Sequence, residues 1–300
     1  MPAWGDQRRR PMEMSTPSRP AWIVTDSTAD FPPGLIEGMP VTVVPLIVEI
    51  EGRSYRDRVD LSPDEFLAKL RRGVLPRTSQ PPAGAFQEVY QDLLDRGYEI
   101  VSIHIAATLS GTLNSASAAT QALGSDRIHL CDTGSVSMGL GWLVIEAAEL
   151  AASGQPAAAI VQYLERRRQH VRLFAMLDTL EYLQKGGRIG RAAAFLGSAL
   201  QVKPIITVRD GAVEPVERVR TFRRGVERLL DLAREHAPFD RLAVLHLDSE
   251  GPARELRDQL QALQPELQIP LSKIGTVVGT YAGPGALGFV GLVQAARSGS

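Results

Sequence analysis

From Trp22 onward, short runs of β-forming residues alternate with longer runs whose apolar residues recur at helical spacing. Trp22–Thr25, Ile100–Ile105 and Ile128–Cys131 have the composition of buried strands, while residues 86–94 and 111–123 follow a helical period. Strands that alternate with helices in this way predict a mostly parallel sheet with helices on its faces. The expected fold class is therefore α/β.

Chain length and local composition predict two domains after a short leader. Three hundred residues suffice for two compact domains. Residues 1–20 are polar, Pro-rich and mixed in charge, which predicts a disordered leader, with Met12 or Met14 as alternative starts. The pattern changes near Gln169–Arg172, where we place the boundary. An N-terminal α/β domain of residues 21–170 and a smaller C-terminal α/β domain of residues 171–300 are expected.

Charge, cysteine content and hydropathy exclude several classes of function. The formal net charge is −1, so no broad positive field favours nucleic acid. Cys131 is the single cysteine, which rules out an intramolecular disulfide and argues against a zinc cluster. No secretory signal or clean transmembrane segment is visible, so we expect a cytoplasmic protein without stable membrane insertion.

Two hydroxyl-rich turns are the strongest functional signal, Thr78-Ser79-Gln80-Pro81 and Thr108-Leu109-Ser110-Gly111-Thr112. Each is expected beside the start of a helix, beyond the carboxyl end of a strand, where ligands bind on parallel sheets. Hydroxyls and free backbone N–H groups at helix starts form a neutral socket for an anion. Thr78, Ser110, Gly111 and Thr112 are therefore the candidate site, although Ser110 could serve only as a helix cap.

Neither turn is accompanied by a lysine, a metal ligand or a nucleophile–base pair. Ser110 has no Gly-x-Ser-x-Gly elbow and no identifiable His or Asp partner, so hydrolase chemistry has little support. Asp26 and Asp30 form a weak metal motif, and hydrogen bonding of Asp26 to neighbouring turns is favoured. The pattern points to binding a carboxylate without transforming it, with no catalytic residue, metal or cofactor.

Two glycine-rich segments lie in the second half of the chain. Lys185-Gly186-Gly187-Arg188 lacks the phosphate-loop pattern, and its arginine lies either near the anionic site or on the free surface. Residues 283–288 match Gly-x-Gly-x-x-Gly without the βαβ unit that a dinucleotide site needs. Gly283 and Gly285 instead predict a tight turn at the domain interface and are candidates for lining a pocket. A small-residue helix over 192–200, with Ala194 and Phe195, could leave space for a ligand or allow close packing.

Taken together, five motifs over residues 21–293 resemble the DegV family: Val24–Asp30, Thr78–Pro81, Leu109–Thr112, Lys185–Ile189 and Gly283–Gly288. The resemblance implies a two-domain fold that encloses one long-chain fatty acid between its domains. It also implies a non-catalytic carrier subunit, which presents the carboxylate to a bacterial fatty acid kinase for acyl-phosphate formation.

The resemblance assigns roles to individual residues as well. Thr78 and Ser110 match the positions whose hydroxyls hold the carboxylate, and Arg188 matches an arginine linked to phosphorylation. Tyr281 departs from the pattern, because relatives often carry histidine there. By its position it is, with Arg188, a candidate for coupling to phosphorylation or for facing the partner. Two alternatives stay open, namely a small-molecule phosphotransferase that acts unaided and a regulatory module that responds to lipid.

Overall fold

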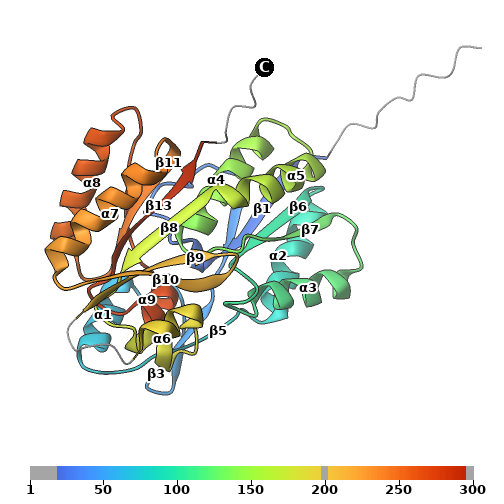
Figure 1. The fold of residues 1–300 in the computed structure, drawn as a ribbon. Helices are drawn as coiled ribbons and strands as arrows, with labels where there is room; N and C mark the ends of the chain where they lie inside the picture. Colours follow the sequence, from blue (N-terminus) through green and yellow to red (C-terminus); the bar gives the residue numbers. More distant parts are fainter. Residues whose placement is uncertain (1–18, 197–201, 295–300) are drawn as a thin grey trace, which may run out of the picture.

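The computed structural model describes residues 19–196 and 202–294, which form a five-layered α/β structure (Figure 1). Two β-sheets lie on either side of a central helical layer, and further helices cover their outer faces. The α/β class predicted from the sequence is confirmed. Of the predicted leader, residues 1–18 lie outside the described part of the chain.

The first sheet is parallel throughout, as the strand–helix alternation predicts. Its four strands have the order β2-β1-β6-β7. They are β1 (Ala21–Asp26), β2 (Val41–Val44), β6 (Glu99–His104) and β7 (Ile128–Asp132). Helices α2 (Ala83–Asp95) and α3 (Thr112–Leu123) cover one face, and α4 (Met138–Ala152) and α5 (Ala157–Arg167) cover the other.

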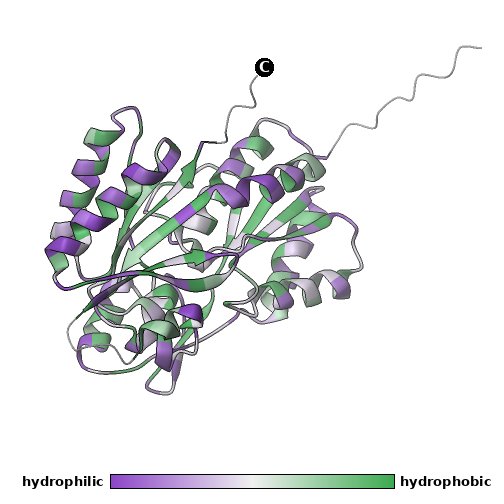
Figure 2. Cartoon of the chain, viewed as in Figure 1, coloured by the Kyte–Doolittle hydropathy of each residue, from purple (hydrophilic) through white to green (hydrophobic). Residues whose placement is uncertain are grey.

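The second sheet has six strands in the order β10-β9-β8-β13-β11-β12, and only its β11–β12 pair is parallel. The strands are β8 (Val171–Met176), β9 (Lys203–Arg209), β10 (Ala212–Val219), β11 (Phe239–His246), β12 (Leu271–Lys273) and β13 (Leu287–Val293). Helices α7 (Phe222–His236) and α8 (Glu250–Leu263) cover its outer face. Figure 2 shows polar residues on the outward sides of both helices, as expected for amphipathic surface helices.

Helix α4 joins the two sheets because it is apolar around most of its circumference. Twelve of its 15 residues are buried, and it packs against β1 and β6 of the first sheet and against β8 and β13 of the second. A helix without a polar face cannot lie at a surface, so α4 becomes a central layer. The largest hydrophobic cluster consequently includes residues from both sides of Gln169–Arg172. The domain boundary at that point stays a prediction.

A small antiparallel sheet, β4-β3-β5, lies beside the two large ones. It contains β3 (Ile47–Ile50), β4 (Arg53–Arg56) and β5 (Arg77–Ser79). The predicted hairpin at Glu51-Gly52 is confirmed, and both turn residues have positive φ angles, of 52° and 76°, as a two-residue hairpin turn requires. Residues 41–50 divide between two sheets, since Pro45 lacks an N–H and interrupts the strand.

Short helical segments complete the described chain. They are η1 (Ser27–Ala29), α1 (Pro63–Arg71), η2 (Arg168–His170), α6 (Glu181–Lys185), η3 (Gly190–Phe195) and α9 (Thr276–Ala282). The predicted capping box of Ser62 and Glu65 is present at the start of α1. The helix predicted over 192–200 is wrong in its described part, because residues 190–195 form a 3₁₀ segment; residues 197–200 lie outside the described residues.

Within residues 19–196 and 202–294, every helix is too short or too polar to span a bilayer.

Candidate functional site

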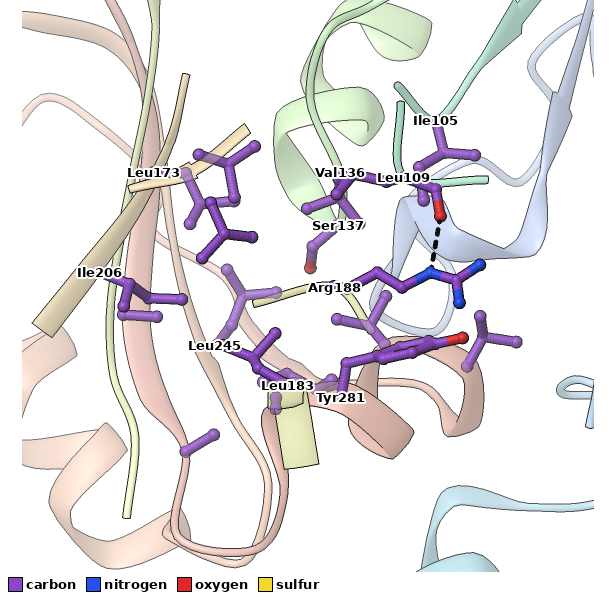
Figure 3. A pocket seen from close by; sticks show the side chains of 18 of the residues that line it. Ile105, Leu109, Val136, Ser137, Leu173, Leu183, Arg188, Ile206, Leu245 and Tyr281 are labelled. Atoms are coloured by element: carbon purple, nitrogen blue, oxygen red, sulfur yellow. Dashed lines mark hydrogen bonds between the residues drawn. The ribbon is translucent and has the colours of Figure 1, made fainter. Parts of the chain in front are cut away.

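A cavity lies between the inner face of the six-stranded sheet and the helices beside it (Figure 3). Its wall is formed by apolar side chains of β8, β9, β10, β11 and β13 and by α9, with Leu173, Ile206 and Leu245 among them. The space between atoms in and around the cavity, including its open end, is about 1030 Å³. Most of the lining side chains are apolar, so the cavity suits an apolar ligand.

Polar residues gather at one end of this cavity: Thr78, Ser79, Gln80, Ser110, Arg188 and Tyr281. Ser79, Gln80 and Arg188 are exposed, whereas Thr78, Ser110 and Tyr281 are half-buried, so this end opens to the surface. We call these six residues the polar mouth. A cavity with a polar mouth and an apolar interior suits an amphiphilic molecule with a single polar end.

Thr78 reaches the mouth from an unexpected element. It belongs to β5 and is paired with Val48 of β3, so it lies in the small antiparallel sheet. The prediction that both hydroxyl turns follow strands of the parallel sheet is therefore wrong for this turn. Its hydroxyl contacts the Tyr281 hydroxyl of α9, with the two oxygens 2.5 Å apart. This contact spans 203 positions in the sequence, which places Tyr281 beside the carboxylate candidates.

Ser110 lies in the loop between β6 and α3, as predicted, and serves two purposes. Its Oγ accepts a hydrogen bond from the Thr112 N–H at 3.3 Å and lies 2.8 Å from the Thr112 Oγ1. The Thr112 N–H is thus already paired, and the fully buried Thr112 side chain does not line the cavity. The N-cap of α3 is Gly111, and no side chain caps the helix, so Ser110 closes the turn just before α3 and also lines the cavity.

Gly111 brings the two hydroxyl turns into direct contact. A Cβ at this position would lie 2.9 Å from the side-chain amide of Gln80, closer than carbon atoms normally approach. The missing side chain therefore lets the Thr78 turn pack directly on the Ser110 turn. Gly111 itself does not line the cavity.

Arg188 lies at the polar mouth, beside the predicted anionic site. Its Nε donates to the Leu109 carbonyl at 3.2 Å (dashed line in Figure 3), and its Nη1 donates to the Gly186 carbonyl at 2.9 Å. The guanidinium lies 5.2 Å from the centre of the Tyr281 ring, within the range of a cation–π contact. The arginine is therefore held at the cavity entrance from three directions.

The glycines of both glycine-rich segments allow aromatic rings to pack closely. A Cβ on Gly186 would lie 2.4 Å from the Tyr281 ring, and one on Gly283 would lie 2.3 Å from the Tyr182 ring. Gly283 and Gly285 have φ angles of 74° and 84°, as a tight turn after α9 requires. These glycines fit α6 against α9, but they do not line the cavity.

The lining of this cavity differs from the pocket residues that the sequence suggested. Among the described residues, the cavity lining includes none of Ala194, Phe195, Gly283 and Gly285. The Phe195 ring instead lies 4.7 Å from the Arg218 guanidinium. The small residues in the wall are Ala175, Ala282, Ala286 and Gly288. Strand pairing across the second sheet decides this placement, and helical spacing in the sequence carries no such information.

Ser137 is a lining residue that the sequence did not single out. It is buried at the start of α4, adopts a φ of 56°, and its hydroxyl donates to Asp30 at 2.6 Å. Asp30 also accepts from the Gly275 N–H at 2.8 Å and pairs with Arg58 at 3.1 Å. This cluster joins the turn after β1 to α4 and to the segment that leads into α9. A serine directly before a long apolar helix was the only local signal.

Burial makes the Asp30 carboxyl sensitive to pH. It raises the pKa of Asp30 to about 6, even though Arg58, Ser137 and Gly275 favour the charged form. Because the folded pKa exceeds the unfolded value of 3.8, the stabilisation is present at low pH and is lost as pH rises through 6. The stability advantage of wild type over Asp30→Asn should shrink by about 3 kcal/mol in all, and about 2 kcal/mol of this change should fall between about pH 4 and pH 6. Urea unfolding of both proteins at a series of pH values measures this difference in the free energy of unfolding.

Asp60→Asn is the control for this pH series. Asp60 is exposed, and its hydrogen bonds to Arg56 lower its pKa to about 2, so its stabilisation is present above pH 3.8 and lost below. Its pH slope therefore has the opposite sign and lies at lower pH. An Asp30→Asn difference that is constant or grows from pH 4 to 6 would contradict the assignment.

Within residues 19–196 and 202–294, no group of three or more His, Cys, Asp or Glu side chains could hold a metal ion. The Asp26–Asp30 turn is hydrogen bonded instead, as favoured from the sequence: Asp26 accepts from the Thr28 N–H at 3.1 Å and from the Ile105 N–H at 3.0 Å.

The fold and the cavity together define the class of this molecule: a two-sheet α/β protein with an internal apolar cavity and a hydroxyl-rich mouth. The family model described as an uncharacterised protein of the DegV family matches residues 21–293. A DegV domain-containing protein from Deinococcus radiodurans is 40% identical over 271 residues, 89% of this chain and 96% of the relative. The chain belongs to the DegV family.

Solved structures agree with this assignment. A DegV family protein from Thermus thermophilus, whose structure is described as showing fatty acid binding, matches with a TM-score of 0.84 and 36% identity. The alignment covers 91% of this chain and 99% of that one. DegV from Bacillus subtilis, described as a fatty acid binding protein, has a TM-score of 0.83 and 34% identity over 92% of this chain and all of its own.

Proposed function

We propose that this protein binds one long-chain fatty acid, with the acyl tail in the cavity and the carboxylate at the polar mouth. One observation carries the proposal: Thr78 and Ser110, from separate elements, line the polar mouth of the same largely apolar cavity. The two relatives described as fatty acid binding support it. Thr78, Ser110 and Tyr281 are the proposed partners of the carboxylate.

The energetics assign different tasks to the tail and the head group. Burial of a tail of about fifteen carbons offers roughly 12 kcal/mol before ordering costs, at about 0.8 kcal/mol per methylene. Each neutral hydrogen bond to the carboxylate adds only about 1 kcal/mol net. The tail therefore supplies affinity, and the hydroxyls set orientation and the preference for an acid.

We further propose that the protein is a carrier that presents its bound carboxylate to a separate fatty acid kinase. The exposed Arg188 lies at the same open end as Thr78 and Ser110, so a partner enzyme could reach the head group there. The carrier alone should not hydrolyse ATP with or without palmitate. ATP turnover by the purified chain would instead favour a phosphotransferase that acts unaided.

Native mass spectrometry of the purified protein tests fatty acid binding directly. The expected spectrum contains a mass increment equal to one acyl chain, which solvent extraction removes and added palmitate restores. Repeated recovery of empty protein that also fails to take up palmitate would overturn the proposal.

The double variant Thr78→Val/Ser110→Ala tests the carboxylate site. Loss of two hydrogen bonds of about 1 kcal/mol each should weaken palmitate binding about thirtyfold. Affinity for methyl palmitate should change little, because the tail contacts remain. Displacement of a fluorescent fatty acid measures both affinities, and thermal melting separately reports the loss of the Ser110–Thr112 hydrogen bond.

Thr120→Val/Ser125→Ala is the matched control, since both hydroxyls lie at or beyond the far end of α3 and outside the cavity lining. It should keep the wild-type preference for the acid over the ester. Equal preference in the two double variants would remove Thr78 and Ser110 from the proposed site.

A further inference from the structure

Four polar side chains form an unbroken hydrogen-bonded chain behind the wall of the polar mouth. The Tyr90 hydroxyl lies 2.6 Å from the Ser102 Oγ, and the same Oγ lies 2.7 Å from the Nε2 of His104. The Nδ1 of His104 lies 3.0 Å from the Oδ2 of Asp26. All four residues are 0% exposed, in a layer that is otherwise largely apolar. Polar groups are rarely buried in such a place without a task.

The donor and acceptor properties of these four groups set the direction of the hydrogen bonds from Tyr90 to Asp26. A carboxylate only accepts, so the Nδ1–H of His104 donates to Asp26. The Nε2 of the neutral imidazole is then an acceptor, which makes Ser102 its donor and Tyr90 the donor to Ser102. With this tautomer every hydroxyl and ring nitrogen in the chain has a partner. The imidazole is further held edge-on by the Phe86 ring, with the centres 5.1 Å apart.

The two ends of the chain lead to the two hydroxyl turns. Tyr90 belongs to α2, which begins at Ala83, directly after the turn that contains Thr78. At the other end, Asp26 accepts from the Ile105 N–H at 3.0 Å, and Ile105 lines the cavity at the start of the Ser110 loop. The buried chain therefore connects the helix that follows one turn to the strand end that precedes the other.

On the cavity side, the two hydroxyl turns contact each other closely, but through a side chain that can change its conformation. There, the two turns meet where Gln80 packs on Gly111, and Gln80 is an exposed, flexible side chain. Such a contact sets a minimum separation and cannot by itself hold the turns together. Behind the wall, α2 packs on α3, and the hydrogen-bonded chain adds contacts of defined length and direction between the elements that carry the turns.

We propose that Tyr90, Ser102, His104 and Asp26 are positioning residues that set the distance between Thr78 and Ser110 for a carboxylate. The inference rests on the proposed function and names the groups that make the mouth selective for an acid. A carboxylate needs donors on both oxygens at defined places, whereas the tail requires only apolar volume. Disruption of the chain should therefore lower the preference for an acid and leave tail affinity unchanged.

Ser102→Ala breaks the chain at its centre and is the test variant. The measured quantity is the ratio of the dissociation constants of methyl palmitate and palmitic acid, obtained by displacement of a fluorescent fatty acid. This ratio should fall about fivefold or more, the equivalent of one misplaced hydrogen bond. Methyl palmitate affinity should stay within about twofold, since the neutral ester depends on the tail. Ser102→Thr, which keeps the hydroxyl, should have the same ratio as the wild-type protein.

Tyr163→Phe is the control for a lost hydroxyl that is hydrogen bonded and partly buried. The Tyr163 hydroxyl donates to Glu146 at 2.8 Å between α4 and α5, and Tyr163 does not line the cavity. The Tyr163→Phe variant should have a lower melting temperature than wild type but the same ratio of the two dissociation constants. If Ser102→Ala does not fold, Tyr90→Phe is the replacement variant. It removes the last hydroxyl of the hydrogen-bonded chain and should also lower the ratio of the dissociation constants of methyl palmitate and palmitic acid.

The outcomes separate this inference from the proposed function. If the wild-type protein does not prefer the acid, the proposed carboxylate site fails and the positioning role with it. If wild type prefers the acid and Ser102→Ala or Tyr90→Phe keeps the full preference, only the positioning role is overturned. A fall in affinity for acid and ester alike would also overturn it, because a purely structural role predicts that result.

Discussion

Ala175→Phe should weaken palmitate binding about a hundredfold. Ala175 lies in β8, faces the cavity and pairs across the sheet with Gly288 of β13, so this part of the wall is made of small residues. A phenyl ring there would occupy the volume of roughly four methylenes of the tail. At about 0.8 kcal/mol each, their exclusion costs roughly 3 kcal/mol. Displacement of a fluorescent fatty acid by palmitate measures the change.

Chain length provides the internal control. Octanoic acid should bind Ala175→Phe and wild type with similar affinity, because a short tail need not pass the ring. Ala158→Phe adds the same ring at an exposed position of α5 and should leave palmitate binding unchanged. Undiminished palmitate binding by folded Ala175→Phe would show that the tail does not occupy this cavity.

Glu146→Ala should lower the free energy of unfolding by about 4 kcal/mol, the largest effect on stability that we expect. Glu146 of α4 and Arg167 of α5 are both only 7% exposed, and their paired atoms lie 2.9 and 3.1 Å apart. Removal of one partner from a buried ion pair typically costs about 3–5 kcal/mol. Asp240 at 2.6 Å still pairs with Arg167 in this variant, but the hydrogen bonds that Glu146 accepts from Tyr163 and Arg241 are lost as well. Urea unfolding measures the loss.

Glu149→Ala tests whether burial is the cause. Glu149 lies on the same helix and pairs with Arg241, but its side chain is 47% exposed. Exposed ion pairs contribute less than about 1 kcal/mol, so this variant should remain close to wild type. Equal destabilisation by both variants would contradict the buried pair as the source of the effect.

Local chemistry made part of the fold readable from the sequence. The Ser62–Glu65 capping box and the Glu51-Gly52 hairpin turn depend on contacts within a few residues, and both are present. The parallel first sheet followed from the alternation of strands and helices. The helix predicted over 192–200 depended only on its composition of small apolar residues, and its described part forms a 3₁₀ segment instead.

The candidate site likewise has one part that local sequence predicts and another that depends on contacts between distant residues. Ser110 was identified because a strand, a hydroxyl and a helix start follow one another in the chain. Tyr281 was noted because relatives often carry histidine there, just before the glycine-rich turn, and its contact with Thr78 could not be derived from the sequence. The cavity wall escaped prediction because five strands contribute to it, and their order in the sheet is not their order in the chain.

The sequence by itself determined the strands and helices that local patterns encode, and the two hydroxyl turns. It also carried the family resemblance that the comparisons confirm. Only the tertiary structure decided which side chains face one another: Thr78 and Tyr281, Gln80 and Gly111, and the chain from Tyr90 to Asp26. The reason is that local conformation depends on neighbouring residues, whereas the shape of a cavity depends on how segments distant in the sequence pack together.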